Sequence, residues 1–177
     1  MKKVLKAIKS IILTLLGIAF FVFALSITIL LLNYNKYGLT QFGTTTFVII
    51  SDDITSEIVK KGDLVLVDSK KINELEIGDE IFAYRLGDNG SVSVELGKVG
   101  QVYLDENAVS FENGDIFSMK FVIGSADKIY NKIGTYLSVL ESKWGFLFLI
   151  LVPCLLIFIY EIYALVVEIK YGAEEEE

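Results

Sequence analysis

The sequence has no histidine, one cysteine and one proline among its 177 residues. The absence of histidine removes the commonest general base and the commonest metal ligand of proteins. With Cys154 as the single thiol, neither a disulfide within the chain nor a Cys/His zinc cluster can form. The net charge is −7, and no basic stripe with interleaved aromatic residues occurs, so nucleic acid is not expected as a partner. We expect no cofactor and no resident metal.

Hydrophobic residues make up 53% of the chain and gather in two long runs. The first run covers residues 11–32 and follows a segment, residues 1–10, that carries four lysines. A helix of about 20 apolar residues crosses a bilayer core of about 30 Å. We therefore expect a membrane helix over 11–33, with the basic N-terminus in the cytoplasm by the positive-inside rule. The alternative is a cleaved signal peptide, whose apolar region is shorter, about 7–15 residues.

The second run covers residues 144–167 and contains Pro153 and Glu161. Proline is tolerated in a spanning helix when neighbouring groups satisfy the freed carbonyl. We place Glu161 near the cytoplasmic interface; the alternative is a buried functional carboxylate. Two spans return the chain to its starting side, which puts the acidic tail, residues 168–177, in the cytoplasm. The middle, residues 34–143, would then form a domain outside the cell membrane.

The middle of the chain predicts a mostly β domain. Gly87-Asp88-Asn89-Gly90 has the composition of a hairpin turn, and residues 68–77 form a polar connector with room for one helical turn. Gly62-Asp63 and Gly78-Asp79 are interpreted as turns in which Gly adopts a special φ and Asp binds nearby backbone N–H groups. The expected strands are rich in β-branched and aromatic residues and cover 44–50, 64–67, 80–85, 91–96, 99–104, 108–111 and 120–124.

An apolar strand, a polar elbow, a Gly-Asp turn and a second apolar strand follow one another around Ser51-Asp52-Asp53-Ile54-Thr55-Ser56 and Gly62-Asp63-Leu64-Val65-Leu66-Val67. This order resembles the signal peptidase I family of membrane-bound serine proteases. Gly78-Asp79-Glu80-Ile81-Phe82-Ala83-Tyr84 and Glu112-Asn113-Gly114-Asp115 are similar to later motifs of that family. The run from Lys132 to Pro153 resembles the C-terminal part of its endoplasmic-reticulum-type branch, which includes archaeal and some Gram-positive enzymes.

The resemblance implies a signal-peptidase-like β domain flanked by transmembrane helices, but both catalytic positions depart from the family's pattern. Asp53 stands where the family has its serine nucleophile, and the link to Gly62 is one residue longer than usual. Gly97 falls at the position of the general base, and Lys98 follows it at the position of an arginine. Asp115 matches an aspartate that supports the catalytic site. The serine dyad is therefore expected to be absent.

Three other kinds of chemistry stay open at this point. Ser51 or Ser56 could act as nucleophile with Lys98 as base, if burial lowers the lysine pKa. Asp53 and Asp115 could form an acid pair of the aspartyl-protease kind. The acidic turn, Asp52 and Asp53 with Glu57, could hold a divalent cation or could simply be solvated.

The sequence thus leads to three hypotheses about function. The first is a signal peptidase I-like membrane protein without the dyad, which binds or presents exported or surface proteins. Relatives with a substituted dyad are thought to assist pilus assembly, and that role is implied by resemblance alone. The second is an active signal peptidase with an unusual Ser/Lys dyad. The third is a non-catalytic membrane scaffold or complex subunit. The expected partners are the lipid bilayer, segments of exported proteins and another membrane protein.

Overall fold

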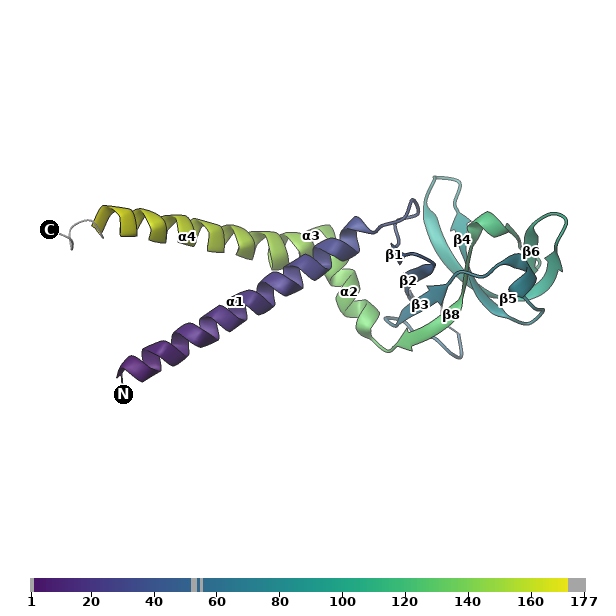
Figure 1. Ribbon diagram of the computed structural model, residues 1–177. Coiled ribbons are helices and arrows are strands. Elements are labelled where there is room, and N and C mark those ends of the chain that lie inside the picture. The colour runs from purple at the N-terminus through teal and green to yellow at the C-terminus, as the bar shows by residue number, and fades with distance from the viewer. Residues whose placement is uncertain (1, 52–53, 55, 172–177) are drawn as a thin grey trace. The chain divides into compact units, whose positions relative to one another are not determined.

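A computed structural model describes residues 2–51, 54 and 56–171. The chain divides into two compact units. One consists of Met1–Ile27 with Val139–Glu177, and the other of Thr28–Ser138. Figure 1 shows the helices that dominate the first unit and the strands that form the second.

Long apolar helices are the main feature of the first unit. Helix α1 covers Lys2–Leu32, and its last residues belong to the second unit. After α2 (Ile133–Glu141) come α3 (Lys143–Phe146), a π-helical turn η4 (Leu147–Leu151) and α4 (Val152–Tyr171). Two segments, Thr14–Leu32 and Lys143–Val167, are long and apolar enough to cross a membrane, as the sequence predicts for these regions.

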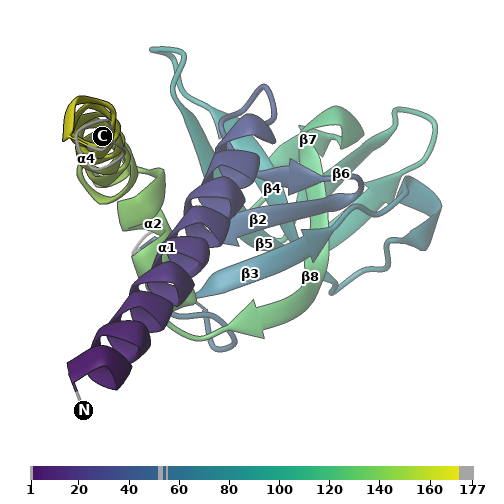
Figure 2. The same cartoon turned by 60° about the vertical axis from the view of Figure 1, so that its left-hand side comes forward.

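The second unit contains one curled antiparallel sheet of eight strands, which can be followed in Figure 2. The spatial order is β1-β2-β3-β8-β4-β5-β6-β7. The protein is therefore mostly β between two apolar helical segments, in agreement with the coarse expectation. The strands are β1 (Gln41–Phe42), β2 (Thr45–Ile49), β3 (Leu64–Asp68), β4 (Glu80–Leu86), β5 (Val92–Tyr103), β6 (Ala108–Phe111), β7 (Ile116–Ser118) and β8 (Val122–Tyr130).

Several predicted strands coincide with observed ones, and three differ. The segments 91–96 and 99–104 form a single strand, β5, because Gly97 and Lys98 continue the ladder with β4 opposite Ile81 and Glu80. A bulge between Val99 and Gln101 lies in the neighbouring ladder with β6. The predicted strand 120–124 begins as the 3-10 turn η3 (Met119–Phe121) and continues to Tyr130 as β8. The helical turn expected within 68–77 is present as η2 (Ile72–Glu74).

Both Gly-Asp turns have the predicted chemistry. Gly62 and Gly78 adopt φ values of +84° and +93°, a region in which only glycine is unstrained. The Lys60 N–H donates to Asp63 Oδ2, and the Glu76 N–H donates to Asp79 Oδ2, each at 3.0 Å. These turns direct the chain into β3 and β4.

Two apolar clusters hold the sheet together. The first gathers on one face of β2, β3, β4 and β8, around Val48, Val65 and Phe82. The second lies around Ile81, Val99 and Phe111 and includes Phe117. Because neighbouring residues of β4, such as Ile81 and Phe82, belong to different clusters, this strand is buried on both faces.

Candidate functional site

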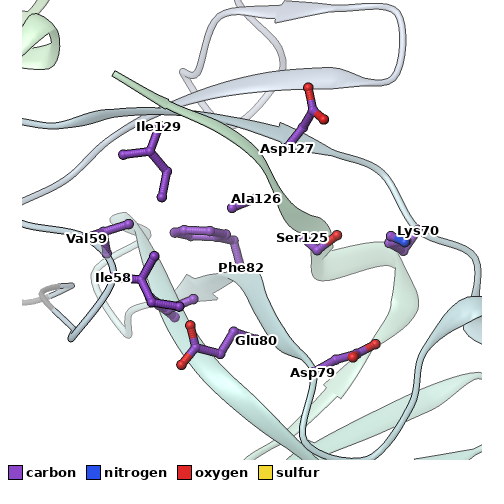
Figure 3. Close-up of a pocket in the computed structure, with 11 residues that line it drawn as sticks. Ile58, Val59, Lys70, Asp79, Glu80, Phe82, Ser125, Ala126, Asp127 and Ile129 are labelled. Atoms are coloured by element: carbon purple, nitrogen blue, oxygen red, sulfur yellow. The ribbon is translucent and has the colours of Figure 1, made fainter. Parts of the chain in front are cut away.

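A hollow of about 440 Å³ lies in the second unit beside the segment that follows the elbow. The side chains that line it come from four parts of the chain: the segment that follows the elbow, the connector after β3, the start of β4 with its partner β5, and β8. Figure 3 shows most of them around the ring of Phe82. The lining residues are Ile58, Val59, Lys70, Asp79, Glu80, Phe82, Leu96, Ser125, Ala126, Asp127 and Ile129.

The hollow has an apolar part and a polar part. Ile58, Val59 and Ile129 lie together near the Phe82 ring, whereas Lys70, Asp79 and Ser125 lie on the other side of the view (Figure 3). The charged groups that line the hollow are the three carboxylates of Asp79, Glu80 and Asp127 and the ammonium group of Lys70. A cavity with apolar walls and a few charged groups is typical of a binding site.

The elbow is described only in part, since Asp52, Asp53 and Thr55 lie outside the described residues. The assignment of Asp53 to the nucleophile position, the Asp53–Asp115 pair and the cation site therefore stay predictions. Ser51 is exposed, and Ile54 is buried in the first apolar cluster. The Ser56 hydroxyl accepts hydrogen bonds from the N–H groups of Ile58 (3.2 Å) and Val59 (3.4 Å), which makes it part of a local turn.

Asp63 anchors the far end of the elbow and is 4% exposed. One carboxylate oxygen accepts the Lys60 N–H and the other accepts the Lys132 N–H, both at 3.0 Å. The Thr135 N–H donates to the Gly62 carbonyl at 3.1 Å, and Gly134 lies so close that a Cβ there would meet the Asp63 carbonyl oxygen at 2.6 Å. Asp63 therefore joins the elbow to the start of α2, a role that the sequence analysis did not assign to it.

Gly97, the residue at the predicted base position, lies against an aromatic ring. A Cβ at this position would be 2.1 Å from Cδ2 of Phe111. That ring is 3% exposed and stacks at a tilt on Phe117, with 4.7 Å between centroids. Phe111 thus occupies the space that a side chain at position 97 would need.

The Lys98 side chain lies on the face of β5 opposite to the face at which Gly97 meets Phe111. Its ammonium lies 4.0 Å from Glu80 Oε1, and its side chain is 55% exposed. Within the described part of the chain, no hydrogen bond joins the hydroxyl of Ser51 or Ser56 to this ammonium. The partner that the structure assigns to Lys98 is a carboxylate at the rim of the hollow.

Asp115 belongs to a polar cluster on another part of β4 and β5. Its carboxylate accepts hydrogen bonds from Arg85 and from the Asn113 side chain, and Arg85 also donates to Glu95. The hydrogen bonds to Glu95 and Asp115 raise the pKa of the Arg85 guanidinium. Arg85 also lies over the Phe117 ring, 5.4 Å from its centroid. The sequence analysis identified Asp115 but not its arginine partner.

Comparisons with protein-family models, with curated proteins and with solved structures find no match to this chain.

Proposed function

We propose that this chain is a signal peptidase I-like membrane protein whose serine dyad has been replaced, and that it holds an extended segment of an exported or surface protein without cutting it. The observation that carries the proposal is the hollow beside the elbow, which combines apolar walls with charged groups. Presenting such a segment for pilus or surface assembly is the biological role we assign.

The surroundings of Gly97 and Lys98 support the proposed loss of hydrolysis. A serine nucleophile needs a base within about 2.6–3.2 Å of its hydroxyl. Phe111 fills the space beside Gly97, and Lys98 is paired with Glu80. The Lys98 side chain is 55% exposed and its ammonium lies 4.0 Å from Glu80 Oε1, and within the described residues neither the Ser51 nor the Ser56 hydroxyl is hydrogen-bonded to it.

The two apolar helices support attachment to the membrane. We propose that both termini face the cytoplasm, because lysines precede the first span and two spans return the chain to the same side. The β unit would then be outside, where segments of exported proteins emerge.

Photocrosslinking with the full chain in lipid nanodiscs tests the proposal. One variant carries p-benzoylphenylalanine in place of Ile58, an exposed side chain that lines the hollow, and the control carries it in place of Leu104, which is exposed but does not line it. The probe is a synthetic peptide with an apolar signal-type segment followed by a polar extended segment. We expect a crosslink from position 58 only, and an intact peptide by mass spectrometry.

Two results would change the conclusion. If neither position crosslinks above the level of a scrambled peptide, the hollow does not hold extended segments. If the peptide is cut, and Ser51→Ala, Ser56→Ala or Lys98→Ala abolishes the cut, the chain is an active Ser/Lys peptidase.

A further inference from the structure

Strand β8 has an open edge next to the hollow. On one side it pairs with β3 through Ser125, Ala126 and Lys128–Tyr130, and a bulge at Asp127 interrupts this ladder. On its other side it pairs with β4, but this ladder ends where Ile81 lies opposite Ser125. Residues 126–130 therefore have no strand on that side within the described part of the chain. At about 3.3 Å per residue, this edge is about 16 Å long.

Within the described residues, the chain before β4 makes no backbone hydrogen bond to this edge. The Gly78 N–H donates to the Val99 carbonyl at 2.7 Å, and the Val99 N–H donates to the Asp79 carbonyl at 2.8 Å. The turn before β4 is thus bonded to β5 on the far side. Since Ala126, Asp127 and Ile129 all line the hollow, the open edge forms one of its walls.

Unpaired strand edges bind extended peptides by adding them as a further strand. Every pair of neighbouring strands in this sheet is antiparallel. A peptide added antiparallel to β8 would continue the line of β4 backwards, so its C-terminal end would reach Glu80. Its N-terminal part would lie near Ile129 and Tyr130.

The lining of the hollow defines which side chains fit at each end. Val59, Phe82 and Ile129 form the apolar part, which suits an aliphatic residue of the peptide. The carboxylates of Asp79, Glu80 and Asp127 suit a cation. Glu80 is paired with Lys98 and Asp79 accepts a backbone N–H, so the exposed Asp127 has the greatest remaining capacity.

We infer that the hollow takes an extended peptide that adds antiparallel to residues 126–130 of β8, with an aliphatic residue N-terminal to a lysine or arginine. This inference rests on the proposed function and adds to it the strand that is used, the direction of the peptide and the chemical class of the segment.

A set of N-methylated peptides tests the strand addition. The probe is a fluorescein-labelled peptide of ten residues, polar except for one leucine and one arginine C-terminal to it, with the full chain in nanodiscs. In an antiparallel ladder, the N–H groups that point toward the neighbouring strand belong to alternate residues. We therefore prepare two peptides, methylated at the odd or the even amides. One of them should lose about tenfold in affinity or more by fluorescence polarisation, and the other should stay within about twofold of the parent.

The outcomes separate this inference from the proposed function. Binding of the unmethylated peptide with equal losses in both methylated series, or with no loss in either, overturns strand addition and leaves the holding function in place. A failure of the unmethylated peptide to bind overturns both.

Charge substitutions test whether the hollow binds the cationic side chain of the peptide. Asp127→Asn should lower the affinity for the parent peptide by about two- to fivefold, as expected for a solvent-exposed ion pair. The substitution should have no effect on the affinity for a peptide with glutamine in place of arginine. Asp105→Asn is the matched control, because Asp105 is an exposed acid on the β5–β6 turn outside the hollow. Equal effects of the two substitutions would overturn recognition of a cation by the hollow.

Discussion

Replacing Gly97 by alanine adds one methyl group at the predicted position of the general base, next to the Phe111 ring. Its Cβ would be 2.1 Å from Phe111, and the ring has little room to move because it is buried and packed on Phe117. Overpacking of this kind typically costs about 1–3 kcal/mol. The φ angle of Gly97 is not in the left-handed region, so alanine also gains about 0.5–1 kcal/mol by stiffening the unfolded chain. Subtracting this gain leaves a net loss of up to about 2.5 kcal/mol.

Pulse proteolysis in urea on the full chain in micelles measures this loss, and thermal unfolding should show a Tm lower by roughly 5–10 °C. Gly100→Ala is a graded control on the same strand, since a Cβ at that position would meet the Phe111 carbonyl oxygen at 3.2 Å instead of a ring carbon at 2.1 Å. Its effect should be clearly smaller.

A double-mutant cycle identifies the cause. Phe111→Ala alone should cost about 3–5 kcal/mol, because it removes a buried ring. Once the ring is gone, the three atoms nearest to a Cβ at position 97 are gone with it, so the double variant should be more stable than the sum of the single effects predicts, by about 1–3 kcal/mol. Additive effects would refute the assignment of this space to Phe111. For the same reason Gly97→His should restore no peptidase activity.

Two further predictions concern buried polar groups. Asp63→Asn should destabilise the chain by about 1–3 kcal/mol in urea, because one of the N–H groups of Lys60 and Lys132 loses its carboxylate acceptor; an unchanged midpoint would contradict the anchoring role. Burial raises the pKa of Tyr84 above 10.0, although the Asn35 side chain donates to its hydroxyl at 2.7 Å. The folded state therefore favours the neutral phenol: this stability is complete below pH 10 and is lost as the pH rises through the raised pKa. Tyr84→Phe should lower stability at neutral pH but flatten its decline above about pH 10; a decline as steep as that of the parent protein would show that another group is responsible.

The elements that were predicted well are those whose signals are local. The apolar runs that became α1 and α4 exceed the length of a bilayer span, and the turns at Gly62 and Gly78 follow from the positive φ that their backbones require. The sequence analysis assigned no element of its own to the segment that forms helix α2, whose position depends on contacts between Gly134 and the backbone of Asp63. Such a contact joins residues far apart in the chain, which no local pattern reveals.

The faces of β5 show why the site could be predicted only in part. Cross-strand partners share a face of the sheet, and the structure pairs Phe82 with Leu96 and Ile81 with Gly97. Phe82 and Leu96 line the hollow, whereas Ile81 belongs to the second apolar cluster, so Gly97 faces that cluster and not the hollow. Matching motifs along the sequence compares residue types and spacings, and a bulge or one inserted residue can keep both while exchanging the two faces. A dyad requires both side chains on one face. The residue types led to the prediction that the dyad is absent, and the strand register adds that Gly97 lies on the face of β5 opposite to the hollow.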